Sequence, residues 1–107
     1  MQHYRHYYRS VDGSQYFDFY FYNIGLLRGW RIYIIGHIDY GNRNASFHST
    51  HRLHDHSGTY DYICWNRRIA SLKDAKRIAA LWADTTALYI KNGGNFDTIA
   101  NQLMRNR

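Results

Sequence analysis

The sequence predicts an α+β fold, in which an antiparallel sheet of about five strands is followed by one long and one short helix packed on one face. Residues 1–65 contain short runs rich in tyrosine, phenylalanine and isoleucine, separated by turn residues, a pattern typical of strands. Residues 71–107 instead carry apolar side chains at helical spacing. The length of 107 residues predicts a single domain over residues 1–107.

The first two strands are predicted at residues 2–9 and 15–22, as a hairpin. Asp12-Gly13 lies between them, and this dipeptide is a strong hairpin indicator between two β-rich runs. Side chains of a strand alternate between its two faces, so the second strand is expected to bury one set of aromatic residues and expose the other. The buried set is Phe17, Phe19 and Phe21, and the exposed set is Tyr16, Asp18, Tyr20 and Tyr22.

Three further strands are predicted from the same kind of pattern. The third spans Trp30–Ile38, the fourth spans residues 45–53, and the fifth spans Tyr60–Trp65. The connections Asp39–Asn42 and Asp55–Gly58 are short and rich in turn residues. Such short connections favour an antiparallel meander, in which strands adjacent in sequence are adjacent in the sheet.

Two helices are predicted in the second half of the chain. Ser71 is a good N-cap with Asp74 at the capping-box position, and Asn92–Gly94 supplies a left-handed C-cap. Asn95 then caps a short helix. The long helix presents an apolar stripe that should cover the phenylalanine face of the sheet and leave the opposite face open. The stripe consists of Leu72, Ala75, Ile78, Ala79, Trp82 and Tyr89.

The charge of the chain favours an acidic partner. Lys+Arg number 14 against 8 for Asp+Glu, a net charge of +6, and most of the cations are arginine. Arginine matches phosphate geometry and stacks on aromatic rings, and the chain also contains 11 tyrosines. We therefore expect nucleic acid or a nucleoprotein complex as the partner, with an acidic protein surface as the alternative.

Several classes of protein are disfavoured. Cys64 is the single cysteine, so no internal disulfide can form, which fits a reducing compartment. No apolar stretch approaches the roughly 18–20 residues of a membrane span, and the first residues lack the apolar region of a secretory signal. We expect a cytoplasmic protein without a membrane partner.

The candidate binding residues form two groups. The first is an arginine and tyrosine surface on the open face of the sheet, where arginines neutralise phosphates and tyrosine rings stack on bases. Its members are Arg5, Arg9, Tyr20, Tyr22, Arg31 and Tyr33. The second is a basic patch where the sheet leads into the long helix, and its members are Arg67, Arg68, Lys73 and Arg77. As an alternative, the tyrosine face is buried in a homodimer or simply solvated.

A histidine cluster offers a second kind of site. His54 and His56 are two residues apart and would share one side of a strand, with His48 further along it. Asp55 and Asp61 lie nearby, and such clusters bind Zn²⁺ or other transition metals. The runner-up function is thus a metal-binding protein or a metal-dependent hydrolase that uses these three histidines. The chain has no nucleophile-elbow motif and no glycine-rich phosphate loop, so we expect no enzyme and no cofactor.

One segment resembles a DNA-binding family. The stretch from Tyr62–Trp65 through Ser71–Ala75 and on to Trp82 is similar to the strand–turn–helix of AP2-type and integrase N-terminal DNA-binding domains. In those families a small antiparallel sheet reads the major groove while the following helix supports it. The resemblance implies a sheet-reading DNA-binding protein of a mobile element.

The size, architecture and absence of enzyme motifs are also similar to those of small mobile-element and viral proteins, including anti-CRISPR proteins. Those are single compact domains that block a CRISPR effector by occupying a nucleic-acid or conformational surface. A net charge of +6 favours binding to RNA, DNA or an acidic patch over mimicry of DNA. We therefore expect a non-enzymatic protein acting on nucleic acid or a nucleoprotein complex, and the resemblance implies an anti-CRISPR-type inhibitor.

Overall fold

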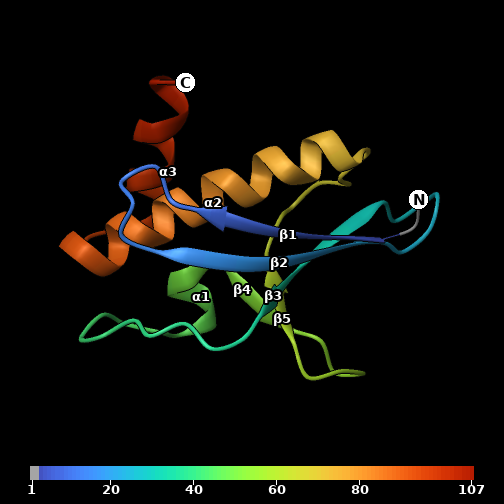
Figure 1. The fold of residues 1–107 in the computed structure, drawn as a ribbon, viewed down its shortest axis with the longest axis horizontal. Helices are drawn as coiled ribbons and strands as arrows, with labels where there is room; N and C mark the ends of the chain where they lie inside the picture. Colours follow the sequence, from blue (N-terminus) through green and yellow to red (C-terminus); the bar gives the residue numbers. More distant parts are fainter. Residues whose placement is uncertain (1–2) are drawn as a thin grey trace.

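The computed structural model describes residues 3–107 and has a five-stranded antiparallel sheet crossed on one face by a long helix, as Figure 1 shows. A short helix follows the long one, so the predicted α+β fold is confirmed. The strand order across the sheet is β1-β2-β3-β5-β4. The elements are β1 (His3–Arg9), β2 (Tyr16–Asn23), β3 (Trp30–Ile35), α1 (Phe47–Thr50), β4 (Arg52–His54), β5 (Asp61–Ile63), α2 (Leu72–Asn92) and α3 (Phe96–Arg105).

The predicted hairpin joins β1 and β2, with Arg9 opposite Tyr16 at its closed end. Asp12 fixes the turn, because its Oδ1 accepts hydrogen bonds from the Ser14 N–H (2.9 Å) and the Ser10 hydroxyl (2.7 Å). The predicted start of the first strand at residue 2 lies outside the described residues. The turn chemistry read from the sequence therefore sets the register of the first two strands.

The alternation predicted for β2 is confirmed, and β3 alternates in the same way. Phe17, Phe19 and Phe21 are 4%, 0% and 0% exposed, and they face the same side as Ile32 and Ile34 of β3. The tyrosines of β2 point to the opposite side. β3 ends at Ile35 instead of the predicted Ile38, because Gly36 takes a positive φ of 85° that breaks the extended backbone.

The predicted strand over residues 45–53 is wrong over most of its length. Ser46 caps the short helix α1, with its hydroxyl accepting from the Ser49 N–H (3.2 Å), and the Thr50 hydroxyl donates to the Ser46 carbonyl (2.7 Å). His51 ends the helix in the left-handed conformation, with a φ of 53°. Local hydrogen bonds of serine and threonine thus compete with strand pairing here, and only Arg52–His54 is extended.

The predicted meander is also wrong, because β5 lies between β3 and β4. The connection from Gly36 to His51 includes α1 and carries the chain one strand position past β3 before β4 begins. β4 then pairs with β5 as a hairpin, and β5 returns beside β3. This order places the buried Ile63 within the sheet and leaves a short, polar strand at the edge, where it limits pairing with other chains.

The core lies between α2 and the phenylalanine face of the sheet. Ser71 caps α2 by accepting from the Asp74 N–H (3.1 Å), as predicted. The Trp82 ring packs edge-on against the rings of Phe17 and Phe19, with ring centroids 5.7 and 6.1 Å apart, which is a favourable aromatic geometry. Buried alanines of α2 let the helix approach the sheet closely, and these are Ala75, Ala79, Ala83 and Ala87.

The short helix α3 packs on α2 and completes the core through Phe96. Phe96 is 7% exposed. The centroid of its ring lies 6.4 Å from that of Trp82 and 4.9 Å from that of His51. The His51 imidazole also contacts the Asp97 carboxylate (Nε2 to Oδ1, 3.0 Å). No helix within residues 3–107 has the length and apolar character needed to cross a membrane.

A buried carboxylate ties the hairpin and the end of the chain to α2. Asp84 is 4% exposed and accepts hydrogen bonds from the Tyr8 hydroxyl (3.0 Å) and the Val11 N–H (2.9 Å), and it also pairs with Arg107. Burial, followed by the hydrogen bond to Asp84, raises the pKa of Tyr8 to about 12. The Tyr8 hydroxyl is therefore a donor that helps to satisfy a buried charge.

We expect Tyr8→Phe to lower the free energy of unfolding by about 1 kcal/mol near neutral pH, because the substitution removes one donor from Asp84. The pKa of Tyr8 is higher in the folded state than its unfolded value of about 10. Its stabilisation is therefore fully present below about pH 10 and is lost as the pH rises towards about 12. Urea unfolding of both proteins at about pH 8 and about pH 11 tests this, and a pH-independent difference would contradict it.

Candidate functional site

The outer face is the side of the sheet turned away from α2, and it brings the predicted arginine and tyrosine residues together. The strand register places Arg5 opposite Tyr20, Tyr20 opposite Tyr33, and Tyr33 opposite Tyr62 of β5. Tyr22 lies opposite Arg31. All six residues predicted for this surface share the outer face, and these are Arg5, Arg9, Tyr20, Tyr22, Arg31 and Tyr33.

Four tyrosines form a continuous line of rings on the outer face, which we call the tyrosine row: Tyr22, Tyr20, Tyr33 and Tyr62. The centroids of successive rings lie 6.1, 6.4 and 6.1 Å apart. Tyr22 is 40% exposed and the other three are half-buried. Such rings combine an accessible aromatic surface with a polar edge.

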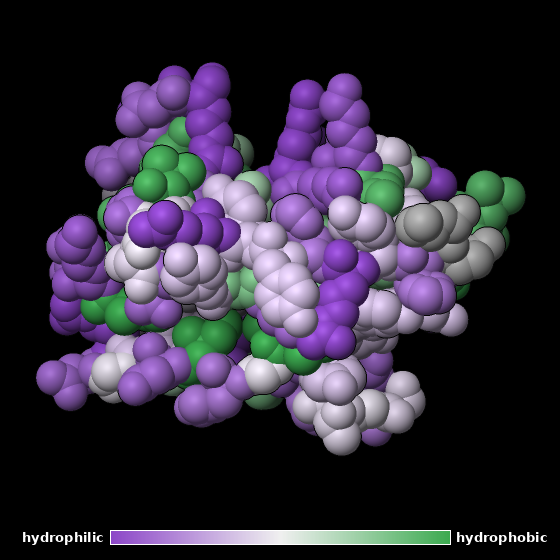
Figure 2. Space-filling view, viewed as in Figure 1, coloured by the Kyte–Doolittle hydropathy of each residue, from purple (hydrophilic) through white to green (hydrophobic). Residues whose placement is uncertain are grey.

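The surface seen in Figure 2 is largely hydrophilic or near neutral, and strongly hydrophobic side chains occur on it only in small, separate patches. The near-neutral colours include those of tyrosine and tryptophan. On the outer face the strand register places Arg5 and Arg31 directly opposite tyrosines, so aromatic and charged side chains are mixed there. That mixture is typical of interfaces that bind charged, planar ligands.

The arginines of the outer face are held over the rings. Arg31 Cζ lies 4.1 Å from the centroid of Tyr62, within the range of a cation–π contact. Arg5 and Arg31 are also paired with carboxylates. Arg5 forms two hydrogen bonds to Asp18 (3.0 and 2.5 Å), which raise its pKa, while Arg31 lies 3.6 Å from Asp55.

Asp55 remains ionised under all ordinary conditions. A hydrogen bond from the Tyr33 hydroxyl (2.7 Å) and then hydrogen bonds from Ser57 hold the pKa of Asp55 at about 2. Burial, followed by the same contact to Asp55, raises the pKa of Tyr33. Part of the positive charge of the outer face is thus balanced by aspartates that fix the positions of its arginines.

A hollow opens beside the tyrosine row because β5 stays beside β3 for a short distance. The two strands pair through two residue pairs, the last being Tyr33 opposite Tyr62. Beyond this point the Cys64 N–H donates to the His51 carbonyl (2.9 Å), so the chain continues beside the end of β4. The space that a longer β5 would fill next to β3 is left open.

The far end of the hollow is closed by a single backbone contact. The Trp30 N–H donates to the Ile69 carbonyl (2.9 Å), and Gly29 and Ile69 form an isolated parallel bridge. Between this bridge and the end of β5, the hollow measures about 410 Å³. This volume falls within the range of about 300–1,000 Å³ found for small-ligand pockets.

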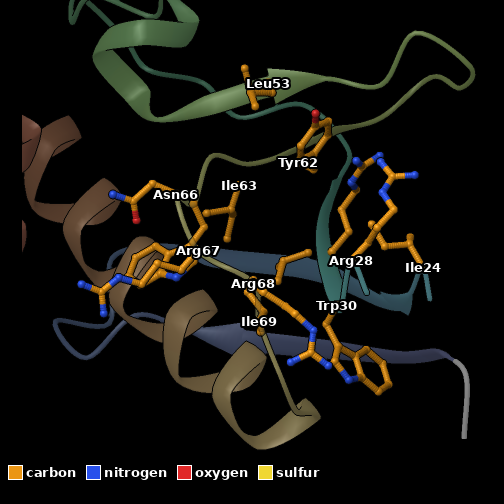
Figure 3. Close-up of a pocket in the computed structure, with 13 residues that line it drawn as sticks. Ile24, Arg28, Trp30, Leu53, Tyr62, Ile63, Asn66, Arg67, Arg68 and Ile69 are labelled. Carbon is orange, nitrogen blue, oxygen red and sulfur yellow. The ribbon is translucent and has the colours of Figure 1, made fainter. Parts of the chain in front are cut away.

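Arginine and aromatic side chains line this hollow. Its arginines come from two segments that are far apart in sequence, and Figure 3 shows Arg28 and Arg67 on opposite sides of it with Arg68 beside Trp30. The cationic members are Arg28, Arg31, Arg67 and Arg68, and the aromatic members are Trp30, Tyr62 and Trp65. No carboxylate is among the described residues that line the hollow.

The arginines of the hollow differ in their contacts. Arg31 is paired with Asp55, and Arg68 Nε donates to the Leu26 carbonyl (3.0 Å). Within residues 3–107, no carboxylate lies within 4 Å of a side-chain nitrogen of Arg28, Arg67 or Arg68. The hollow therefore concentrates positive charge that the protein itself leaves uncompensated.

The second predicted basic patch is divided by the fold. Arg67 and Arg68 lie in the segment before α2 and line the hollow together with Arg31. Lys73 and Arg77 are exposed on α2 and are not part of the lining. Only the first half of this patch is thus continuous with the outer face.

Arg28, Trp30 and Trp65 belong to the site, although sequence reasoning did not select them. Both arms of the hollow share an unusual composition, Arg-Gly-Trp-Arg at residues 28–31 and Trp-Asn-Arg-Arg at residues 65–68. This repeated combination of tryptophan and arginine was the available indication. Their proximity depends on the bridge between Gly29 and Ile69, which local patterns do not reveal.

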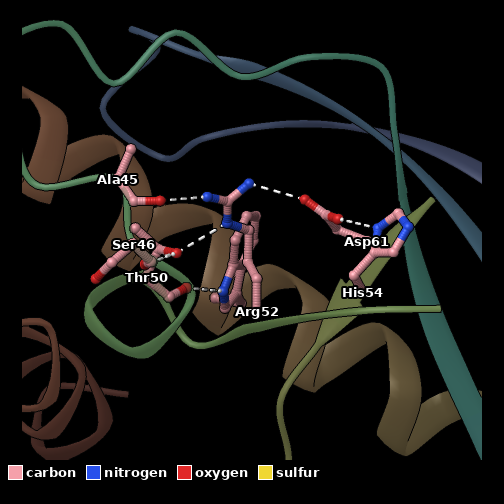
Figure 4. A network of polar contacts seen from close by, with 7 residues as sticks. Ala45, Ser46, Thr50, Arg52, His54 and Asp61 are labelled. Carbon is pink, nitrogen blue, oxygen red and sulfur yellow. Dashed lines mark hydrogen bonds and ion pairs between the residues drawn. The ribbon is translucent and has the colours of Figure 1, made fainter. Parts of the chain in front are cut away.

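The histidine cluster is arranged differently from its prediction. His48 lies on α1, His54 on β4 and His56 in the turn that follows, so the three do not share a strand. His54 Nδ1 lies 3.0 Å from Asp61 Oδ1, and Arg52 donates to the other Asp61 oxygen (2.9 Å), as Figure 4 shows. Among residues 3–107, no group of three or more histidine, cysteine or acidic side chains is placed to hold a metal ion.

Arg52 is the centre of this second network. Its guanidinium also donates to the Thr50 hydroxyl (2.8 Å) and the Ala45 carbonyl (2.7 Å), and it stacks on Tyr40 (4.9 Å). A largely buried guanidinium beside Asp61 opposes the binding of a cation at the same carboxylate. The network thus holds α1 against β4 and β5.

We expect Gly29→Ala to destabilise the protein more than Gly36→Ala. Both glycines have a positive φ, 78° and 85°, so both substitutions cost about 1–2 kcal/mol of backbone strain. A Cβ at Gly29 would also lie 2.3 Å from the Ile69 carbonyl oxygen, whereas nothing lies within 4 Å at Gly36. Urea unfolding should show a further loss of about 1–3 kcal/mol for Gly29→Ala. Equal losses would contradict the close approach of Gly29 to the Ile69 carbonyl.

No protein-family model matches this chain, and no curated protein or solved structure matches it either. The resemblances to AP2-type domains and to anti-CRISPR proteins therefore stay predictions. The function of this chain is inferred from the hollow, which is lined by arginine and aromatic side chains and continues into the aromatic outer face of the sheet.

Proposed function

We propose that this protein binds nucleic acid, free or within a nucleoprotein complex, through the hollow and the outer face of its sheet, and that it does so without catalysing a reaction. The observation that carries this proposal is the hollow itself. Four arginines and three aromatic side chains meet there without a carboxylate in the described lining. Phosphates and bases are the two chemical groups that such a set recognises together.

The electrostatics support a polyanionic ligand. Arg28, Arg67 and Arg68 have no carboxylate partner among the described residues, and the chain carries a net charge of +6. Binding of a phosphate backbone releases condensed counterions, which makes clustered arginines effective. A guanidinium also forms two parallel hydrogen bonds to one phosphate, which fixes the position of the backbone.

The narrower predictions follow from the same surface. A protein that occupies guide RNA or target DNA of a CRISPR effector would need this kind of basic, aromatic face, so an anti-CRISPR-type inhibitor remains one proposed form. A sheet-reading DNA-binding protein of a mobile element is another. An acidic protein surface would also pair with the arginines, and the salt dependence and ligand specificity of binding separate these partners.

We expect binding to DNA and RNA oligonucleotides to weaken steeply with salt, with a slope of log K against log salt of about −0.7 to −0.9 per phosphate contacted. Arg28→Gln and Arg67→Gln should each make this negative slope shallower by about one and weaken binding similarly for different sequences. Fluorescence anisotropy at several salt concentrations measures both quantities. Absence of binding at low salt would contradict the proposal.

Arg105→Gln is the matched control for these two variants. It removes the same charge from an exposed arginine at the end of α3, which Figure 1 places at the opposite end of the molecule from the β2–β3 turn that carries Arg28. The control should leave the slope nearly unchanged. An equal effect of all three substitutions would indicate attraction by net charge and no defined site.

We expect Asp55→Asn to have the opposite effect and to strengthen binding. The asparagine side chain can still accept from Ser57 at the turn, but it no longer neutralises Arg31. Because the pKa of Asp55 is about 2, the wild-type carboxylate is charged at every working pH. Removing that charge should tighten binding about threefold at low salt, on the scale of one surface ion pair. Weaker binding by a folded Asp55→Asn protein would contradict this role.

A further inference from the structure

The tyrosine row places aromatic rings on the open face of the sheet, and this distinguishes among nucleic acids. In a duplex each base is covered above and below by its neighbours, so a flat protein surface meets phosphates and groove edges. In a single strand the base faces are accessible and stack on aromatic side chains. Tyr22, 40% exposed on an open sheet face, is placed for the second kind of contact.

The hollow has the size and chemistry for one unpaired nucleotide. Its volume of about 410 Å³ suits a small ligand, and Trp30 and Trp65 supply apolar surface within it. Arg28 and Arg67 lie on opposite sides of it in Figure 3. A base that enters the hollow would therefore leave its phosphates close to guanidinium groups.

The hollow and the tyrosine row are continuous. Tyr62 belongs to both, because it ends the row and also lines the hollow. Arg31 stacks on Tyr62 at 4.1 Å and lines the hollow as well. A strand with one base in the hollow can therefore continue across the sheet over Tyr33 and Tyr20 without leaving the aromatic surface.

We propose that the ligand of this surface is single-stranded nucleic acid, with one unpaired nucleotide seated in the hollow and the adjoining bases stacked along the tyrosine row. This rests on the nucleic-acid binding proposed above and specifies its substrate class. Base stacking is tolerant of sequence, because every base presents a π-face. The structure thus assigns recognition of the unpaired state and no recognition of a particular base sequence.

The test compares a labelled single-stranded oligonucleotide with the duplex of the same sequence, at one fixed low salt concentration. Because one stacked base contributes roughly 1–3 kcal/mol, we expect the single strand to bind about tenfold or more tightly than the duplex, and tenfold corresponds to about 1.4 kcal/mol. Equal or tighter binding of the duplex overturns this inference but leaves nucleic-acid binding standing. Binding of neither overturns both.

Ring-specific substitutions separate stacking from charge. Tyr22→Leu removes the aromatic face and should weaken binding of the single strand about tenfold, whereas Tyr22→Phe keeps the ring and should change it less than about twofold. Neither should alter duplex binding. Phe47→Leu is the control, because Phe47 is a similarly exposed aromatic residue (46%) on α1, outside the tyrosine row. Equal effects of Tyr22→Leu on both ligands would overturn stacking.

Tryptophan fluorescence reports on the hollow directly. Trp30 and Trp65 line it, while Trp82 is 4% exposed in the core. A base stacked in the hollow should quench the emission, and Trp65→Phe should reduce this quenching. Inorganic polyphosphate supplies charge without bases and should bind without quenching. Single-strand binding without quenching, or equal quenching by polyphosphate, would overturn the seating of a base there.

Discussion

Trp82 of α2 packs edge-on against Phe17 and Phe19, and this contact decides which face of the sheet is covered. Small alanines on the same side of the helix allow the close approach that the contact requires. The indole N–H also donates to the Thr50 carbonyl (3.0 Å), which fixes α1 to the same layer. With one face covered in this way, strand alternation leaves the tyrosines and arginines of the strands on the other face.

The hollow is a consequence of strand order. In a meander, β4 and not β5 would have been the neighbour of β3. α1 instead carries the chain past that position, and β5 returns beside β3 only as far as the pair Tyr33–Tyr62. The bridge at Gly29 then brings the segment around Arg67 back to the beginning of β3. A gap in backbone pairing, bounded at both ends, is thereby lined with side chains from two distant segments.

The sequence pattern predicted correctly those features that depend on neighbouring residues, namely strand faces and helix ends. The period-two alternation around Phe19 assigned the two faces of β2 correctly, and Ser71 and Gly93 marked the ends of α2. Residues 45–53 were mistaken for a strand, because the capping bond of Ser46 outweighs the β-pattern of that segment. The hollow was not predicted, because it depends on a bridge between Gly29 and Ile69, and no periodicity records a pairing at that separation.

The distribution of partners among the arginines indicates where binding free energy would arise. Asp18 and Asp55 hold Arg5 and Arg31 over tyrosine rings, which lowers the entropy lost on binding but also reduces their net attraction for phosphate. Arg28 and Arg67 have no such partner among the described residues, so their attraction for a phosphate is undiminished. Charge recognition should therefore be concentrated at the hollow. The tyrosine row would contribute mainly through contact area and would guide the chain that the hollow anchors.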